Sequence, residues 1–295
     1  MGRPCWNCAA FTTMSSSSMR TEWIRQEYPE KYINVGISEQ DLVGTAAGLS
    51  LTGFVPFIST YGVFLTGRAW GQIRNTVCYN NLNVKLGGAH AGISVGPDGA
   101  THQALEDIAL MRVIPHMMVI TPCDWWETYK ATMAVYDIKG PSYVRFGRNP
   151  APVVTDKDTP FDLYKAAIFR DGSDVTLFAN GLMVHEALTA ADELAREGIS
   201  ARVVNIHTVK PLDLDTVCTC AAETGAVVVC EEHQIMGGLG GAICEALAQH
   251  CCVPVELVGI QDRFGESGKP DDLLKAYNLS ASDVIQAVHN VLKRK

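Results

Sequence analysis

The stretch 84-VKLGGAHAGISVGPDGATHQ-103 decides how the rest of the chain is interpreted. Its apolar beginning, Val84–Ala89, predicts a buried strand. Two histidines, His90 and His102, and the carboxylate of Asp98 follow on a glycine-rich segment. Because ligands of open α/β sheets gather at the carboxyl ends of strands, we expect these three side chains to line a ligand site. Imidazoles exchange protons with hydroxyl groups near pH 7, which indicates acid–base chemistry there.

A metal site is the competing interpretation of these histidines. Their spacing matches no common zinc motif, so we assign no metal ligand to the chain. Cys5 and Cys8 form a CxxC pair, but no second ligand pair stands at a compatible spacing, and an unstructured start is the favoured interpretation. The ten cysteines follow no signal peptide, which predicts reduced thiols and a cytoplasmic protein.

Strand-like and helix-like runs alternate along the chain on both sides of this stretch. Before a Pro-, Asp- and Thr-rich linker at Asn149–Asp162, strands are predicted at Tyr32–Val35, Phe54–Ile58, Val84–Ala89, Met118–Thr121 and Ser142–Arg145, and helices at Gln40–Leu51, Ala69–Asn80, His102–Met111 and Trp125–Tyr136. After the linker, strands are predicted at Val175–Ala179, Ala201–Asn205, Ala226–Cys230 and Val255–Gly259, and helices at His185–Glu197, Leu214–Thr224, Gly240–Gln249 and Ala281–Lys293.

This alternation is typical of parallel sheets that carry helices on both faces. We therefore predict an α/β fold with two consecutive domains, residues 1–155 and 165–295, each built on a mostly parallel sheet. The length of 295 residues agrees with two domains of about 150 residues each. Hydrophobic residues make up 47% of the chain, which is enough for two cores.

Charge and hydropathy argue against two classes of partner. The net charge of 24 − 32 = −8 argues against general binding of nucleic acid. The stretch Leu42–Gly67 contains no charged residue and could be mistaken for a membrane span. Gly53, Pro56 and many Ser and Thr residues interrupt it, so we expect a buried helix, a turn and a strand, and no association with a membrane.

Two glycine-rich motifs fail as phosphate-binding loops. In 265-GESGKP-270 the lysine is followed by Pro270 where a P-loop needs Ser or Thr, and Arg263 stands where it needs its first glycine. The cluster 237-GGLGG-241 lacks the third glycine of the dinucleotide fingerprint, and close packing of a helix on a strand is the favoured interpretation.

Two further segments place reactive or aromatic side chains among glycines. In 34-NVGISEQ-40, Glu39 follows a predicted strand and begins the next helix, a place suited to hydrogen bonding a nitrogen base. A helix-capping role is equally compatible with this local sequence. In 59-STYGVFLTGR-68, Tyr61 and Phe64 stand three apart on a predicted loop and could hold a flat heterocycle, with ordinary core packing as the alternative.

These three segments, in this order, resemble the pyrimidine-binding domain of transketolase, a thiamine-diphosphate enzyme. The runs 105-LEDIALMRVIP-115 and 143-YVRFGR-148 and the region from Val175 to Gly268 are also similar to it. The resemblance covers roughly Ser18 to the C-terminus. It implies that Glu39 hydrogen-bonds the pyrimidine ring of thiamine diphosphate and favours its imino tautomer, and that Tyr61 and Phe64 pack against that ring.

The resemblance also implies a substrate site. His90 and His102 match histidines that contact the reacting sugar oxygens, and His102 assists proton transfer. Asp98 matches an aspartate that reads a substrate hydroxyl. Arg148 matches an arginine that grips the sugar phosphate, with Arg145 as a weaker candidate for that role. Ser18 falls at the position of a serine that contacts the phosphate.

Two departures from the family's pattern shape the expected assembly. The segment 11-FTTMSSSS-18 has Met14 near an expected acidic position, so we expect the first strand and helix of the domain to be missing or replaced. No diphosphate-binding domain is found, so the chain resembles the C-terminal subunit of a split transketolase. An N-terminal partner would supply the diphosphate contacts and the ligands of Mg²⁺ or Ca²⁺, in a dimer of heterodimers. The C-terminal domain is expected to serve association, with His233 structural or interfacial.

The expected activity is transfer of a two-carbon ketol unit from a ketose phosphate to an aldose phosphate. The nearest enzymatic alternatives share the same module: a 1-deoxyxylulose-5-phosphate synthase or the beta subunit of a 2-oxo-acid dehydrogenase. Both decarboxylate an oxo-acid, whereas Asp98, His102 and Arg148 suit a phosphorylated polyol better than pyruvate. A subunit that binds a partner without completing a catalytic site is the third hypothesis.

Overall fold

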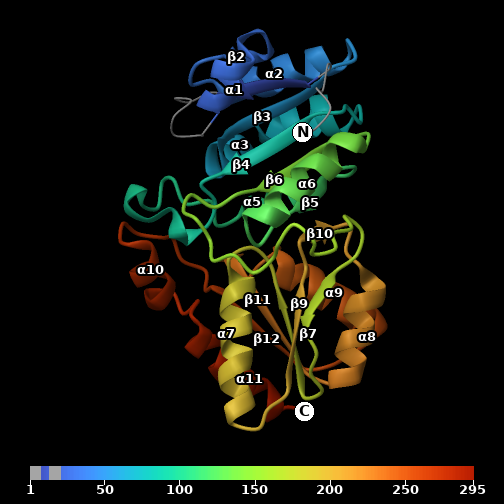
Figure 1. The fold of residues 1–295 in the computed structure, drawn as a ribbon, viewed down its shortest axis with the longest axis vertical. Coiled ribbons are helices and arrows are strands. Elements are labelled where there is room, and N and C mark those ends of the chain that lie inside the picture. Colours follow the sequence, from blue (N-terminus) through green and yellow to red (C-terminus); the bar gives the residue numbers. More distant parts are fainter. Residues whose placement is uncertain (1–7, 13–20) are drawn as a thin grey trace.

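The computed structural model describes residues 8–12 and 21–295. They form two separate sheets, which lie one above the other along the long axis of the molecule in Figure 1. The first sheet holds, in spatial order, β10 (Thr208–Lys210), β5 (Met118–Ile120), β6 (Ser142–Arg145), β4 (Lys85–Ala89), β3 (Val55–Tyr61), β1 (Cys8–Thr12) and β2 (Tyr32–Asn34). All its strand pairs are parallel except β10 with β5.

The second sheet is also mostly parallel. Its order is β12 (Val255–Ile260), β11 (Val227–Gln234), β8 (Val175–Ala179), β9 (Ala201–Asn205) and β7 (Ala167–Arg170). Only the edge pair of β7 with β9 runs antiparallel within this sheet. The predicted fold class, two mostly parallel sheets with helices, is therefore confirmed.

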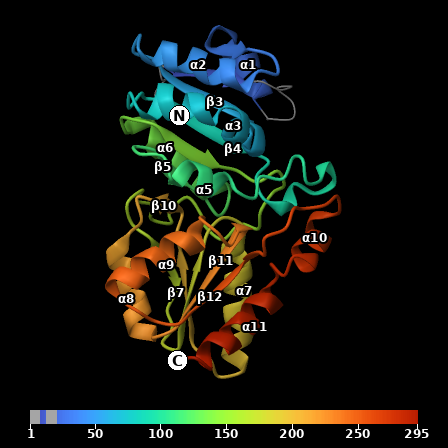
Figure 2. The same ribbon diagram turned by 180° about the vertical axis from the view of Figure 1, so that it is seen from behind.

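Helices cover both faces of each sheet. The first sheet carries α1 (Glu22–Glu27), α2 (Glu39–Ser50), α3 (Gly62–Arg68), α4 (Trp70–Gln72), a π-helical turn at Ile73–Cys78, α5 (Asp107–Arg112) and α6 (Trp125–Asp137). The second carries α7 (Met183–Arg196), α8 (Leu214–Thr224), α9 (Leu239–His250) and α11 (Ala281–Leu292), while α10 (Pro270–Ala276) packs against the segment Ile93–Asp98. Figures 1 and 2 show α7 and α11 on one side of the second sheet and α8 and α9 on the other.

One apolar core joins the two sheets. It contains Ile108 and Met111 of α5, Phe178 of β8 and Ile243 of α9, all fully buried. Such continuous burial is the main source of stability in a packed interior, so the two domains form one body. Smaller clusters lie under α6 and between α7 and α11.

The structure corrects the expected N-terminal region. A strand that the sequence led us to consider missing or replaced is present as β1, which pairs in parallel with both β2 and β3. Cys8 begins this strand, so the expectation of an unstructured start is wrong at that residue. Cys5, Met14 and Ser18 lie outside the described residues.

Two predicted elements around the candidate site also differ. Residues 62–68, expected as a loop, form α3 directly after β3. The helix expected from His102 begins at Asp107 instead, because Ala104 pairs with Ala91 and accepts a hydrogen bond from the Gly92 amide. No helix in the described part of the chain is long and apolar enough to cross a membrane.

Candidate functional site

The candidate site lies along the carboxyl edge of the first sheet. Glu39 follows β2, Tyr61 ends β3, His90 follows β4 and Arg148 follows β6. Because these strands are parallel, their carboxyl ends meet at one edge, where open α/β sheets bind ligands. Residues that are far apart in the sequence are thereby gathered into one place.

Glu39 is buried and only half satisfied. Its side chain is 3% exposed, and Oε2 accepts a hydrogen bond from Arg68 Nη1 at 3.3 Å. The other carboxylate atom, Oε1, is buried and has no hydrogen-bond partner within the described residues. Glu39 is the first residue of α2, which follows Ser38, and no backbone amide of that helix bonds its carboxylate there. The capping alternative therefore has no support in this geometry.

Tyr61 and Phe64 form a stacked aromatic pair that Arg68 links to Glu39. Their ring centroids lie 5.8 Å apart with an interplanar angle of 18°. The spacing of three residues places both rings on one side, because β3 ends at Tyr61 and the chain turns at once into α3. The Arg68 guanidinium lies 4.1 Å from the Phe64 centroid, so one arginine contacts both the carboxylate and the aromatic pair.

The two histidines contact the same aromatic pair from different directions. The His90 ring stacks on Tyr61 at 4.2 Å, whereas His102 meets Tyr61 and Phe64 edge-on at 5.7 and 5.1 Å. Nδ1 of His102 lies 2.9 Å from Thr101 Oγ1. An unbroken series of contacts therefore runs from Glu39 to both imidazoles.

His90 is held neutral and in an unusual backbone conformation. Burial, aided by the charge of Arg148, lowers the pKa of His90 to about 4, although Asp98 opposes this. Its Nδ1 is buried without a hydrogen-bond partner in residues 8–12 and 21–295. Its φ of +54° lies in the left-handed region, which is costly for a residue with a side chain. A neutral imidazole offers one donor and one acceptor to a ligand.

Asp98 and Arg148 form an ion pair at the more open side of the site. Arg148 Nη1 donates to Asp98 Oδ1 and to the carbonyl oxygen of Val95, both at 3.0 Å. The side chain of Arg148 is 35% exposed and that of Asp98 is 26% exposed, so a ligand can reach both. Asp98 ends the 3₁₀ segment Ile93–Asp98. The structure thus brings together all seven predicted site residues that it describes, and only Ser18 lies outside the described residues.

Arg145, the weaker candidate for the phosphate, is placed elsewhere and cannot play that role. It is buried, and its Nε donates to Asp107 Oδ2 at 2.8 Å. Its Nη2 donates to the carbonyl oxygens of Ala104 and Glu232. Tyr143 donates to the same Asp107 oxygen at 2.6 Å. Burial opposes ionisation of Asp107, but the adjacent guanidinium lowers its pKa, so this group is an internal ion pair.

Two residues around the site, Arg68 and Glu232, have no role predicted from the sequence. Arg68 closes the quoted segment 59–68, and its spacing of four residues from Phe64 on a helix was the available signal. Oε1 of Glu232 accepts a hydrogen bond from the Ser94 amide, in the loop Ile93–Asp98, at 2.6 Å. This contact joins residues of different domains, so no local sequence pattern could have indicated it.

The glycine cluster 237–241 packs a helix closely against a strand. Glu231 on β11 accepts hydrogen bonds from the amides of Leu239 and Gly240 at 2.7 and 2.8 Å, which caps α9. A Cβ at Gly238 would lie 2.1 Å from Glu231 Oε2. The glycine cluster therefore serves close packing of a helix on a strand, as predicted. The N-terminus of α9 is occupied by the carboxylate of Glu231.

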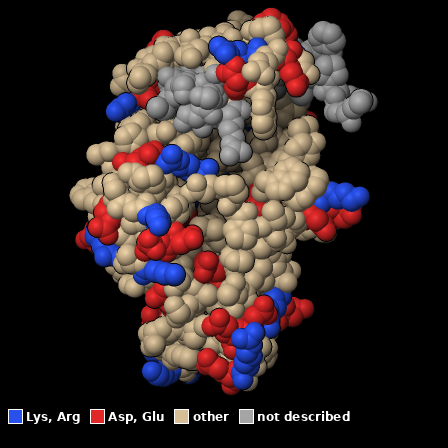
Figure 3. Space-filling model, turned by 60° about the vertical axis from the view of Figure 1, so that its left-hand side comes forward, with Lys and Arg blue, Asp and Glu red and all other residues tan. Residues whose placement is uncertain are grey.

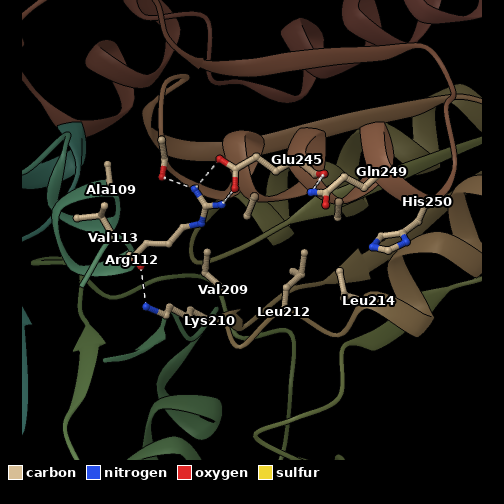
Figure 4. A pocket seen from close by; sticks show the side chains of 13 residues that line it. Ala109, Arg112, Val113, Val209, Lys210, Leu212, Leu214, Glu245, Gln249 and His250 are labelled. Atoms are coloured by element: carbon tan, nitrogen blue, oxygen red, sulfur yellow. Dashed lines mark hydrogen bonds and ion pairs between the residues drawn. The ribbon is translucent and has the colours of Figure 1, made fainter. Parts of the chain in front are cut away.

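A separate hollow of about 700 Å³ lies between α5, the β10 region and α9 (Figure 4). Its charged side chains are already paired. Arg112 contacts Glu245, and Lys210 donates to the carbonyl oxygen of Arg112 at 2.8 Å. It contains none of the predicted site residues, so the carboxyl edge remains the candidate site.

Outside the candidate site we find no concentration of one charge on the face shown in Figure 3, where Lys and Arg lie interspersed with Asp and Glu. The eight cysteines from Cys78 to Cys252 are free thiols. No group of three His, Cys, Asp or Glu side chains in the described ranges could hold a metal ion.

Comparison with known proteins identifies the class to which this fold and site belong. Residues 9–153 match the family model "Transketolase, pyrimidine binding domain", and residues 164–284 match "Transketolase, C-terminal domain". Together the two matches span most of the chain. The chain therefore belongs to the transketolase family.

Relatives of similar length are named as parts of transketolases. The chain is 40% identical over 298 residues to the "Putative transketolase C-terminal section" of Methanocaldococcus jannaschii, covering 100% of this chain and 93% of that protein. It is 41% identical over 282 residues to the 6-deoxy-6-sulfo-D-fructose transketolase subunit of a Clostridium species, covering 96% and 87%.

A solved structure shares the whole architecture. The chain superposes with a TM-score of 0.91 and 44% identity on a structure titled "Split gene transketolase, inactive beta4 tetramer", covering 97% of this chain and 92% of that one. A different activity also occurs among relatives. The 1-deoxy-D-xylulose-5-phosphate synthase of Gloeothece citriformis is 38% identical over 270 residues, which cover 90% of this chain and 42% of that enzyme.

Proposed function

We propose that this chain is the C-terminal subunit of a two-subunit transketolase that transfers a two-carbon ketol unit from a ketose phosphate to an aldose phosphate. The observation that carries the proposal is the buried Glu39 Oε1, which has no hydrogen-bond partner among the described residues, together with the stacked Tyr61 and Phe64 rings, to which Arg68 links the same carboxylate. A buried polar atom without a partner is costly unless a ligand supplies one. The pyrimidine ring of thiamine diphosphate fits, because it combines a flat face with ring nitrogens that can bond a carboxyl group.

Thiamine diphosphate, when bound, supplies the nucleophilic carbon and the electron sink that ketol transfer needs. Glu39 holds a proton between its Oε1 and a ring nitrogen of the pyrimidine. Arg68 keeps the other oxygen of that carboxylate in place. Tyr61 and Phe64 pack against the pyrimidine and exclude water from that side.

His90 and His102 act on the sugar in this proposal. Since the His90 imidazole is neutral at pH 7, it can donate to one sugar oxygen or accept from a hydroxyl. His102, edge-on to both aromatic rings, stands where it can move a proton to or from a reacting oxygen.

Asp98 and Arg148 favour a phosphorylated polyol. Within the described ranges Arg148 bonds Asp98 and Val95 through Nη1, so its Nη2 and Nε can bond a phosphate group. The second oxygen of the Asp98 carboxylate can accept from a substrate hydroxyl. Pyruvate offers neither a phosphate nor a chain of hydroxyls, so this pair suits a ketose phosphate better than pyruvate as the donor.

A partner subunit completes the site. In our proposal it supplies the diphosphate contacts and the ligands of Mg²⁺ or Ca²⁺, and the cofactor lies between chains in a dimer of heterodimers. The support is that the matched domains are the pyrimidine-binding and C-terminal ones, and that relatives of nearly equal length are named as a section or a subunit.

The test is reconstitution with a diphosphate-binding transketolase subunit, thiamine diphosphate and Mg²⁺, assayed with a pentulose phosphate donor and an aldose phosphate acceptor. We expect ketol transfer, and we expect Glu39→Gln to reduce it at least a hundredfold. Asp41→Asn, the same change at an exposed carboxylate of α2, is the matched control and should stay within threefold. Absence of transfer in a mixture whose subunits associate would overturn the proposal.

The second candidate function is favoured by the similarity to a 1-deoxy-D-xylulose-5-phosphate synthase. That enzyme type and the beta subunit of a 2-oxo-acid dehydrogenase both release CO₂ from an oxo-acid. Pyruvate-dependent CO₂ release by the same mixture, without ketol transfer, would select this class. A complex whose activity is unaffected by Glu39→Gln would instead indicate a subunit that only binds its partner.

A further inference from the structure

The carboxyl edge of the second sheet is occupied by the first domain. In open α/β sheets this edge is where ligands bind, at the point where crossovers leave a strand in opposite directions. In the second sheet this point lies at β8, because the next strand in the chain, β9, pairs on one side of β8 and the later strand β11 pairs on the other side. The Gly181 amide after β8 bonds the carbonyl oxygen of Thr121 at 3.3 Å, and Asn205 at the end of β9 donates to Glu127 at 2.7 Å. The carboxyl edge of the second sheet is therefore covered by hydrogen-bonding groups of the first domain.

Glu232 lies near the carboxyl end of β11, and its side chain reaches the loop Ile93–Asp98 of the candidate site. Its side chain is buried, and Oε1 accepts a hydrogen bond from the Ser94 amide at 2.6 Å. The approach requires glycine at position 92, because a Cβ there would lie 2.3 Å from Glu232 Cδ. Gly92 also has a φ of +87°, which favours glycine. The Arg145 guanidinium bonds the Glu232 carbonyl oxygen at 3.0 Å, which fixes the backbone of the same residue.

The loop Ile93–Asp98 is also held by a second part of the C-terminal domain. Gln103 Nε2 donates to the carbonyl oxygens of Ile93 and Glu266, at 3.1 and 2.9 Å. A Cβ at Gly96 would lie 3.3 Å from the Gly268 carbonyl oxygen. In Figure 1 the segment that contains this loop lies next to α10, in agreement with the contacts between them.

The loop's other side carries the substrate-facing ion pair. Asn149 donates to the Ser94 carbonyl oxygen at 2.9 Å, and the neighbouring Arg148 donates to that of Val95. Ser94 is thus bound at its amide by Glu232 and at its carbonyl by Asn149. A change at Glu232 can pass through Ser94 to Val95, whose carbonyl oxygen Arg148 bonds, and on to Asp98 at the end of the same 3₁₀ segment.

We propose that Glu232 is a positioning residue by which the C-terminal domain sets the geometry of the Asp98–Arg148 pair for phosphorylated sugars. This inference rests on the proposed function for its catalytic consequence. Glu232 contacts the loop and has no place among the groups that face the cofactor or the sugar. The C-terminal domain therefore contributes to substrate selection in addition to association.

The first arm of the test measures the loop itself in the isolated chain. We expect Glu232→Ala to speed amide hydrogen exchange at Ser94 at least tenfold. Glu232→Gln, whose amide oxygen can still accept the bond, should remain near the parent. Glu266→Ala is the matched control, because Glu266 uses only its backbone carbonyl there and its side chain is exposed. If the Glu232→Ala variant does not fold, Glu232→Asp takes its place, because a side chain one methylene shorter moves the carboxylate away from the Ser94 amide.

The second arm compares two donors in the reconstituted complex. For a ketose phosphate we expect Glu232→Ala to lower kcat/KM at least tenfold, mainly through KM. For 3-hydroxypyruvate, which carries the ketol group without phosphate, the change should stay within threefold, and Glu232→Gln should restore the phosphorylated donor. Equal losses with both donors, or unchanged exchange at Ser94, would overturn the inference. If the parent complex transfers no ketol unit, the proposed function fails, while the exchange arm still decides whether Glu232 holds the loop.

Discussion

Arg68 Nη1 donates to Glu39 Oε2 at 3.3 Å, while Oε1 of the same carboxylate is buried and accepts no hydrogen bond from the part of the chain that the structure describes. The guanidinium also lies over Phe64, so its position is fixed from two sides. A carboxylate held by one oxygen presents the other in a defined direction. The pair therefore orients the group that we propose to act on the cofactor's ring.

Removing this orientation should slow the reaction. We expect Arg68→Ala to lower kcat of the reconstituted enzyme about tenfold, the equivalent of one charged hydrogen bond at about 1.5 kcal/mol. KM for the sugar phosphate should change less than twofold, because Arg148 is untouched. Steady-state kinetics would check this, with Arg74→Ala, an exposed arginine after α4, as the control. A kcat equal to that of the parent would show that Glu39 is oriented without Arg68.

Local patterns predicted much of the fold, and tertiary contacts account for the rest. The strands Ser142–Arg145, Val175–Ala179 and Ala201–Asn205 and the helix Leu214–Thr224 were predicted with the bounds that the structure has. Short edge strands were missed, notably β10, because three residues carry no periodic signal and pair with a strand of the other domain. The order of apolar runs is a local property, whereas pairing across domains is not.

The same distinction holds for the candidate site. Six of its seven described residues stand in segments that place unusual polar or aromatic groups after strands, whereas Arg148 was predicted only from the resemblance to transketolase. Arg145 was misjudged because its partner Asp107 is distant in the sequence and is buried with it. Glu232 could not be found at all, since its hydrogen bond to Ser94 joins two domains and nothing local marks it.

Gly92 is predicted to be irreplaceable for stability. Gly92→Ala places a Cβ 2.3 Å from Glu232 Cδ at a φ of +87°, so we expect the free energy of unfolding to fall by about 2–4 kcal/mol. Gly44→Ala, in the exposed interior of α2 with open space around it, should gain about 0.5–1 kcal/mol. Denaturant unfolding of the isolated chain measures both.

A double-variant cycle separates the two causes of the loss at Gly92. If the clash with Glu232 dominates, Gly92→Ala combined with Glu232→Ala should be at least about 1 kcal/mol more stable than the sum of the single changes predicts. Strictly additive losses would assign the cost to the backbone conformation alone.

The buried ion pair of Asp107 and Arg145 predicts an asymmetric response to mutation. Asp107→Ala leaves the buried Arg145 guanidinium without the carboxylate that it hydrogen-bonds and should cost about 3–5 kcal/mol. Tyr143→Phe removes only the hydroxyl that donates to Asp107 and should cost about 1–2 kcal/mol. Lys157→Ala, in the exposed pair with Asp158, should stay within about 0.5 kcal/mol. Equal losses from Asp107→Ala and Tyr143→Phe in denaturant unfolding would contradict the assignment.

His207 should make the chain less stable in acid. Burial lowers its pKa to about 4, and its ring packs on Phe161 at 4.6 Å. In the unfolded chain a histidine binds a proton below about pH 6.5, whereas the folded chain binds it only near pH 4. The unfolded state therefore holds more protons between these values, and stability falls as the pH drops from 6.5 to 4. Above pH 6.5 both states are neutral and the group contributes no pH dependence.

The measurement is the free energy of unfolding at pH 7 and pH 5. His207→Gln removes one of the groups that resist protonation, so its loss between these pH values should be smaller than the parent's by about 2 kcal/mol. His90, whose pKa is lowered in the same direction, keeps part of the acid sensitivity in that variant. His250→Gln, at an exposed position of α9, should reproduce the parent's slope. A slope unchanged by His207→Gln would mean that His207 takes up its proton without unfolding.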